Sequence, residues 1–228
     1  MQREAYFCAA RSKNVIDIVV MPQGLHEQPD KLRREVQKAL KRTCDVQHRP
    51  YDASLLGYGL CSNGITGLSA KIPIVIPRGH DCITLLLGSK EKYRQYFETH
   101  RGVYFYSSGW IENGDPPGRN RYERTLKEYE QKFSAENTKY LMETEQKWMT
   151  EYNWATYIDW EFANSENNKK FTKECAEFLG WNYDRIKGDP GLCQRLLDGD
   201  WKNSEFLIVK PGQKISEDLT SNDIIKAE

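Results

Sequence analysis

Short apolar segments alternate with segments of helical periodicity over the first half of the chain, and this alternation most limits how the chain can fold. Residues 54–60 and 72–76 are nearly continuous in apolar character, as expected of strands buried on both faces. Between such runs, Leu32, Val36 and Leu40 recur at helical spacing. The alternation predicts an α/β fold built on a mainly parallel, doubly wound (Rossmann-like) sheet.

The predicted elements continue into the second half of the chain. The strand candidates are residues 5–9, 15–21, 54–60, 72–76, 103–106, 154–160 and 206–209. Helices are predicted from Pro29 onward and over 82–97, 121–152 and 165–179. We predict one α/β domain over residues 1–215, with a largely helical insertion at 113–165, followed by a flexible C-terminal tail at 216–228.

Composition limits the class of protein and its surroundings. The 228 residues include 33 basic and 33 acidic side chains, so no net positive charge attracts nucleic acid. No apolar run approaches the roughly 20 residues that span a bilayer, and the start of the chain lacks the apolar core of a signal peptide. We therefore predict a cytoplasmic protein without nucleic-acid or membrane partners. In that reducing compartment, the six cysteines are expected to be thiols, ligands or nucleophiles.

Cysteine and histidine residues follow three of the predicted strands. Cys8 lies near the end of the first, Cys61 follows the third, and His80 and Cys82 follow the fourth. Ligands of open parallel sheets bind beyond the carboxyl ends of the strands. We therefore predict that these four residues converge on one crevice.

The chemistry of these four side chains favours a metal site. Thiolate and imidazole are good zinc ligands, and thiolate is the usual ligand of iron–sulfur clusters. We predict a Zn²⁺ site formed by Cys61, His80 and Cys82, with Cys8, water or a substrate thiol in the fourth position. One alternative is a 4Fe-4S cluster on the three cysteines, and another makes Cys61 a nucleophile with His80 as its base. A cysteine after a strand is also often a small buried hydrophobe, which applies most to Cys8.

Two charged residues beside the predicted ligands are candidates for catalysis. Asp81 lies between two of them and could support them from outside the coordination shell. Arg78 could pair with an anionic group of a small-molecule substrate. Cys44, Cys175 and Cys193 have no such neighbours in sequence, and we interpret them as structural.

Four further residues are candidates for binding a substrate or cofactor. Gly59, Asn63 and Gly64 surround Cys61, where glycine lets the backbone turn sharply and approach a ligand closely. Trp110 follows the predicted strand at 103–106 and could stack on a flat molecule, or it could cap the core.

At these positions the sequence resembles a family of uncharacterised proteins grouped as domain of unknown function 1638, found mostly in anaerobic archaea and bacteria. The matching segments are residues 57–64, 76–89, 104–110 and 196–201. Members are often encoded near corrinoid-dependent methyltransferases. The resemblance therefore implies a role in one-carbon metabolism, with a small molecule or a corrinoid protein as partner.

A chemical analogy makes this role more specific. Thiol-methylating enzymes that accept methyl groups from corrinoids hold zinc with a His-x-Cys pair and a distant cysteine, and the metal lowers the pKa of the acceptor thiol. His80-Asp81-Cys82 contains such a pair, although the order of ligands along the chain is reversed. The similarity is one of ligand type. It predicts a metal-dependent methyltransferase acting on a small thiol, and the alternative is a metal-free accessory module for a corrinoid protein.

Overall fold

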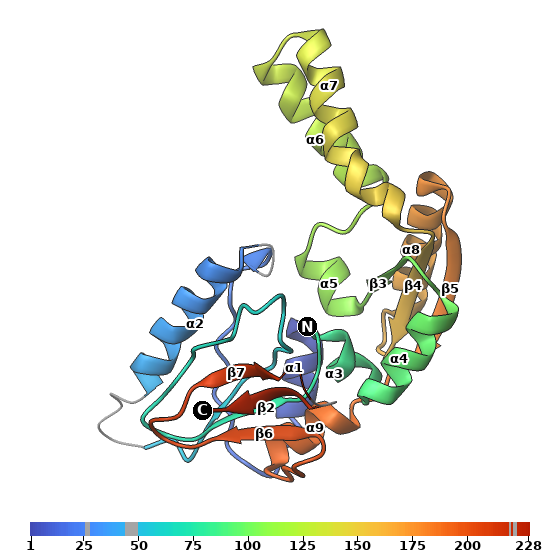
Figure 1. Ribbon diagram of the computed structural model, residues 1–228. Helices are drawn as coiled ribbons and strands as arrows, with labels where there is room; N and C mark the ends of the chain where they lie inside the picture. Colours follow the sequence, from blue (N-terminus) through green and yellow to red (C-terminus); the bar gives the residue numbers. More distant parts are fainter. Residues whose placement is uncertain (26–27, 44–49, 219, 221–222) are drawn as a thin grey trace. The chain divides into compact units, whose positions relative to one another are not determined.

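The computed structural model describes residues 1–25, 28–43, 50–218, 220 and 223–228, which form two compact units (Figure 1). Unit 1 consists of Met1–Tyr93 together with Asp189–Glu228, and unit 2 consists of Arg94–Gly188. The sequence predicts one domain over residues 1–215, whereas the contacts of the folded chain cluster within these two units. Cys44 lies outside the described residues.

Unit 1 contains a three-stranded sheet in the order β1-β2-β6, in which β1 is parallel to β2 and β6 is antiparallel to it. The elements of this unit are α1 (Gln2–Ala9), α2 (Pro29–Thr43), β1 (Ser54–Leu55), β2 (Ile74–Pro77), α3 (Ile83–Leu87), α9 (Gly191–Asp198), β6 (Phe206–Val209), β7 (Ile215–Asp218) and β8 (Ile224–Ala227). The central strand, β2, is buried along its whole length, in agreement with its continuous apolar sequence.

The α2 helix contributes one apolar face to the core of unit 1. Leu32, Val36 and Leu40 recur every four residues and are buried in the same cluster as Ile74 and Ile76 of β2. This is the face that the sequence predicts, because residues four apart lie on one side of a helix.

Two predicted strands near the N-terminus are wrong. Residues 5–9 lie within α1, and residues 15–21 have no regular secondary structure. Val15 is 88% exposed and Val19 is 65% exposed. The β-propensity of these residues is not matched by burial, and burial on a sheet is what stabilises a strand.

The C-terminal residues differ from the predicted flexible tail. β7 and β8 pair as antiparallel strands, with Ile215 opposite Ala227. Ile215 and Ile225 are buried in the core of unit 1. Burial of these two side chains gives the end of the chain a structural role.

Unit 2 contains a parallel three-stranded sheet in the order β3-β4-β5. Its elements are β3 (Val103–Tyr106), α5 (Ser108–Asn113), α6 (Arg119–Lys132), α7 (Ala135–Gln146), the 3₁₀ helix η2 (Lys147–Glu151), β4 (Trp154–Asp159), α8 (Ser165–Leu179) and β5 (Asn182–Lys187); α4 (Lys90–Thr99) begins in unit 1 and ends in unit 2. In the core, Tyr106 and Tyr157 of the sheet pack with Cys175 and Ala176 of α8.

The two longest predicted helices are each broken into two. The helix predicted over 121–152 is a hairpin of α6 and α7, because Phe133 is extended and Ser134 caps α7 by accepting the N–H of Asn137. The helix predicted over 82–97 is α3 followed by α4, with Gly88 ending α3 at φ 81°. Turn chemistry ends these helices where apolar periodicity alone predicts that they continue.

Gly180 ends α8 in the left-handed region, at φ 71°, and an added Cβ there would meet no atom within 4 Å. Gly180→Ala should therefore lower the free energy of unfolding by about 1 kcal/mol through backbone strain alone. Gly180→Asn should cost less, because asparagine tolerates this conformation. Chemical denaturation of both variants checks this order, and equal stability of wild type and Gly180→Ala would contradict it.

The predicted α/β class is confirmed, and the strands of the described residues form small sheets. A mixed three-stranded sheet lies in unit 1, and a parallel three-stranded sheet lies in unit 2. Within the described residues, no helix combines the length and the apolar character needed to cross a membrane.

Candidate functional site

The segments that follow β1 and β2 run side by side in unit 1. The Leu56 N–H donates to the Val75 carbonyl at 2.8 Å, next to the paired strands. Farther along, the Cys61 N–H donates to the carbonyl of His80 at 2.9 Å. Because β1 and β2 are parallel, their carboxyl ends lie at one edge, and the loop around Cys61 meets the His80-Asp81-Cys82 tripeptide there.

Gly59 makes this close approach sterically feasible. A Cβ atom at Gly59 would lie 2.5 Å from the backbone nitrogen of Asp81 and 2.7 Å from the Gly79 carbonyl oxygen. A Cβ at Gly64 would lie 2.7 Å from Cδ2 of Leu32 in α2. Both glycines were predicted to let the backbone approach a ligand, but their close neighbours are other parts of the chain.

Three successive residues at the site adopt the left-handed conformation without being glycine. They are Cys61, Ser62 and Asn63, with φ values of 47°, 52° and 65°. This conformation costs roughly 1–2 kcal/mol per residue. Arg33 stabilises the turn, because its Nη2 donates to the Asn63 carbonyl at 2.8 Å, and the Asn63 amide donates to Glu217 at 3.2 Å. Asn63 therefore holds the turn that presents Cys61, and its predicted ligand-binding role stays a prediction.

The thiols of Cys61 and Cys82 lie close enough to influence each other. Burial raises the pKa of Cys61 to about 11, although its sulfur accepts hydrogen bonds from the N–H groups of Gly59 and Cys82, which lower the pKa. Burial raises the pKa of Cys82 to about 12, and the charges of Asp81 and Cys61 add to this rise. Burial also raises the pKa of Tyr58, whose ring lies beside both thiols, to about 12. The site is thus a pair of partly buried thiols, and the charge of the N-terminal ammonium acts to lower the pKa of Cys82.

Asp81 is held in place beside the thiols. Its Oδ1 accepts the N–H of Ile83 at 2.9 Å, and its Oδ2 accepts the hydroxyl of Tyr93 at 2.8 Å. Burial raises the pKa of Asp81 even though both hydrogen bonds act to lower it. His80 contributes its backbone carbonyl to the site, and its side chain is exposed.

Cys8 lies in a different environment from the one predicted. It belongs to α1, and its thiol is hydrogen-bonded to that of Cys193 in α9, which together with burial raises the pKa of Cys8. Cys193, interpreted as a structural residue without a partner, is therefore half of a buried thiol pair. Among residues 1–25, 28–43, 50–218, 220 and 223–228, no group of three or more His, Cys, Asp or Glu side chains could hold a metal ion. The structure brings together Cys61 and Cys82, and it places Cys8 with Cys193.

Arg78 has its guanidinium group engaged within unit 1. The Nε donates to the Asn203 carbonyl at 2.8 Å, and Nη1 donates to the Ile225 carbonyl at 2.6 Å. Nη1 also lies 3.5 Å from a carboxylate oxygen of Asp223. These contacts tie the end of β2 to the β8 strand, and the predicted pairing of Arg78 with a substrate stays a prediction.

Trp110 belongs to α5 of unit 2. Its indole Nε1 is buried and has no hydrogen-bond partner within the described residues. Its ring lies against Gly114, where a Cβ atom would come within 2.6 Å of the indole. This packing agrees with the second of the two predicted roles, a cap on the core, and stacking on a ligand stays a prediction.

A polar network in unit 2 lies at the carboxyl ends of β3 and β4. Ser108 Oγ is 2.9 Å from the Tyr157 hydroxyl and accepts the Asn168 amide at 2.9 Å. Nearby, Ser165 Oγ donates to Oδ1 of the fully buried Asp159 at 2.6 Å. The sequence does not predict this network, because its members come from three segments and form no local motif.

Tyr58 and Tyr93 are two residues of the thiol site that were not predicted from the sequence. Tyr93 lies within the helix predicted over 82–97, but the break at Gly88 turns α4 so that the Tyr93 hydroxyl reaches Asp81. Tyr58 lies between two glycines and only three residues before Cys61, and this proximity in sequence could have indicated that it belongs to the site.

Comparison with known proteins gives a family and no established activity. The family described as "Protein of unknown function (DUF1638)" matches residues 20–197, which include both arms of the thiol site. No curated protein and no solved structure matches the chain. With this match over most of its length, the chain belongs to the DUF1638 family of proteins of unknown function.

Proposed function

We propose that Cys61 and Cys82 bind a zinc ion as two thiolates, and that an added small thiol or water completes the coordination. The observation that carries this proposal is the pairing of the two partly buried thiols, with the Cys61 sulfur accepting the N–H of Cys82. Thiolates are soft ligands that suit zinc, and N–H groups directed at sulfur stabilise its anionic form. Catalytic zinc sites keep an open position beside three protein ligands, and two thiolates would leave two positions for an added thiol and water.

The parts of the chain around the thiols would serve this site in defined ways. Gly59 allows the two arms to meet, and the left-handed turn at Cys61 lies where its thiol and that of Cys82 influence each other. The hydrogen bonds from Ile83 and Tyr93 keep the Asp81 carboxyl oriented beside the thiols. Zinc, when bound, would supply the positive charge that keeps an added thiol ionised near neutral pH.

The biological role that follows is methyl transfer to or from a small thiol in cytoplasmic one-carbon metabolism, with a corrinoid protein as partner. This role comes from the family resemblance and from the ligand types, and it stays a prediction. The doubly wound, Rossmann-like arrangement predicted from the sequence also stays a prediction.

Zinc binding by anaerobically purified protein tests the proposal. A competition titration with a chromophoric chelator should give about one zinc per chain. Cys61→Ser and Cys82→Ser should each weaken binding by more than about a hundredfold, since losing even an outer-sphere partner costs 10–100-fold. Cys175→Ser is the matched control, because this thiol is buried in unit 2 beside Tyr106 and should leave zinc binding unchanged.

Two results would contradict the proposal. One is protein that binds no zinc and is unaffected by chelator. The other is brown anaerobic protein containing iron and sulfide, which would favour the iron–sulfur alternative. Cys8→Ser also tests the set of zinc ligands, because a large loss of zinc affinity in this variant would show that Cys8 is one of them.

A further inference from the structure

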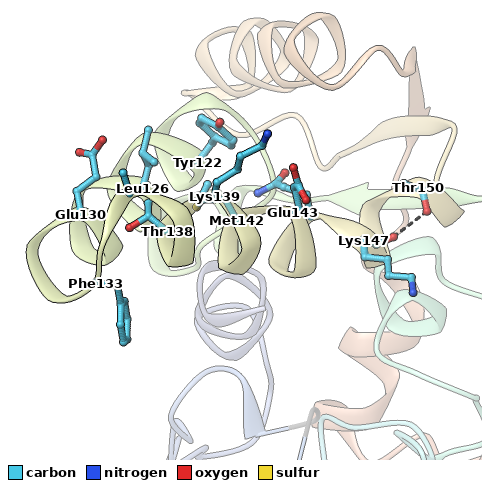
Figure 2. Close-up of a pocket in the computed structure, with 12 residues that line it drawn as sticks. Tyr122, Leu126, Glu130, Phe133, Thr138, Lys139, Met142, Glu143, Lys147 and Thr150 are labelled. Atoms are coloured by element: carbon cyan, nitrogen blue, oxygen red, sulfur yellow. Dashed lines mark hydrogen bonds between the residues drawn. The ribbon is translucent and has the colours of Figure 1, made fainter.

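The α6–α7 hairpin of unit 2 has an apolar groove along its length. The groove has a volume of about 830 Å³. Figure 2 shows the lining residues along the two helices, from Phe133 at the turn of the hairpin to Thr150 at the other end. Its apolar side chains include Tyr122, Leu126 and Phe133 of α6 and its turn and Met142 of α7.

Within unit 2 as the structure describes it, no element covers the tip of the hairpin, whereas its base is anchored. At the base, the Tyr122 ring lies 5.7 Å from that of Phe178, and Arg121 pairs with Glu145 at 2.6 Å. Toward the tip, no residue of α6 is buried, and Phe133 is 46% exposed. Figure 1 shows the hairpin extending away from the β3-β4-β5 sheet of the same unit. A helix of this kind gains stability mainly by burying an apolar face, so a partner is expected on the groove.

The spacing of the lining residues fits a helical partner. On α6 they lie at 122, 126 and 130, followed by 133 in the turn, and on α7 they lie at 135, 138, 139, 142, 143 and 146. These intervals of three and four form continuous rows along both helices, which is the pattern of a groove that receives the apolar face of another helix.

The net charges of α6 and α7 indicate that the partner helices come from a second copy of the chain. α6 has five basic and three acidic side chains, whereas α7 has one basic and three acidic side chains. The charged residues that line the groove are Glu130 of α6, Lys139 and Glu143 of α7, and Lys147 of η2. Within the described residues, neither Glu130 nor Lys139 forms an ion pair. In a two-fold symmetric dimer, α6 of each copy faces α7 of the other, so every opposed pair of helices carries opposite charge.

We propose that the α6–α7 hairpin is a homodimerisation surface, on which two copies form an antiparallel four-helix bundle with Glu130 of each copy beside Lys139 of the other. The interface would bury Leu126, Phe133 and Met142 of both copies. It is independent of the thiol site in unit 1.

Sedimentation equilibrium of the full chain over a range of concentrations tests this proposal. Wild type should be a dimer, and Leu126→Asp should weaken the dimer by more than about tenfold, because it places two charges in the apolar groove. Tyr140→Asp is the control: this residue is 68% exposed and does not line the groove, so the dimer should persist. Circular dichroism checks that the helix content of both variants is retained.

Charge reversal gives a second test that does not depend on folding of the apolar variant. Glu130→Lys and Lys139→Glu should each weaken the homodimer by about tenfold, since each puts two like-charged pairs in the interface. Mixing the two variants should restore a heterodimer of about wild-type affinity. Monomeric wild type, or a dimer that mixing does not restore, would overturn the proposal.

Discussion

Gly59→Ala is expected to lower the free energy of unfolding by about 2–3 kcal/mol and to weaken zinc binding by at least about tenfold. The added Cβ would lie 2.5 Å from the backbone nitrogen of Asp81, so the loop or the tripeptide must shift. The contact is with backbone, which cannot rotate away as a flexible side chain can. A shift of either arm separates Cys61 from Cys82, because Cys61 is only two residues from Gly59.

Gly57→Ala is the matched control for this prediction. Gly57 lies in the same loop, but an added Cβ would meet no atom within 4 Å and its φ is not positive. Its stability and zinc affinity should stay within about 0.5 kcal/mol of wild type. Chemical denaturation and the chelator competition measure both quantities. Equal behaviour of the two alanine variants would show that the close approach at Gly59 does not hold the site together.

Asp159→Asn is expected to destabilise the protein by about 3 kcal/mol at neutral pH, because it removes the buried negative charge with which Lys169 and Arg185 both pair. The Asp159 carboxylate is fully buried at the end of β4 and lies 3.0 Å from Nζ of Lys169 and 2.9 Å from Nη2 of Arg185. Its Oδ1 also accepts the Ser165 hydroxyl at 2.6 Å and the Glu161 N–H at 2.7 Å.

The same network predicts how this destabilisation depends on pH. Burial alone would raise the pKa of Asp159, but the hydrogen bonds from Ser165 and Glu161 and the ammonium of Lys169 lower it below its ordinary value of 3.8. A carboxyl whose pKa is lowered by folding stabilises the protein above its unfolded pKa, and this contribution is lost as pH falls through the folded value. The difference between wild type and Asp159→Asn should therefore be constant from pH 5 to 7 and shrink below about pH 4.

Glu166→Gln is the control for Asp159→Asn, because Glu166 pairs with the same Lys169 at 2.7 Å but is 87% exposed. Exposed ion pairs contribute little, so the change in stability should be below about 0.5 kcal/mol. Urea denaturation at several pH values measures both variants. A pH-independent cost of Asp159→Asn would mean that its charge does not stabilise unit 2.

Elements with strong local signals could be predicted from the sequence. The strand at 103–106, the helix at 165–179 and the strand at 206–209 were predicted with the boundaries that the structure has. Each is bounded by glycine, proline or polar residues, and its apolar residues recur with a clear periodicity. The β5 strand was missed, because Asn182–Lys187 is mostly polar and exposed at the edge of its sheet.

Part of the site could also be predicted from the sequence. Cys61 and Cys82 follow adjacent parallel strands, so the rule of strand carboxyl ends is sufficient to bring them together. That rule failed for Cys8, because the run Ala5-Tyr6-Phe7-Cys8-Ala9 is too short to distinguish a strand from a buried helix segment. The pairing of Cys8 with Cys193 spans almost the whole chain, and no local pattern contains that information.

X-ray absorption at the zinc edge tests the central claim most directly. For anaerobic protein loaded with one zinc per chain and no added thiol, the account predicts two sulfur ligands at about 2.3 Å, with oxygen or nitrogen in the other positions. Adding a small thiol should raise the sulfur count to three, and Cys82→Ser should reduce the count without added thiol to one or abolish binding. Zinc with no sulfur ligand, or with four before thiol is added, would contradict a site formed by Cys61 and Cys82.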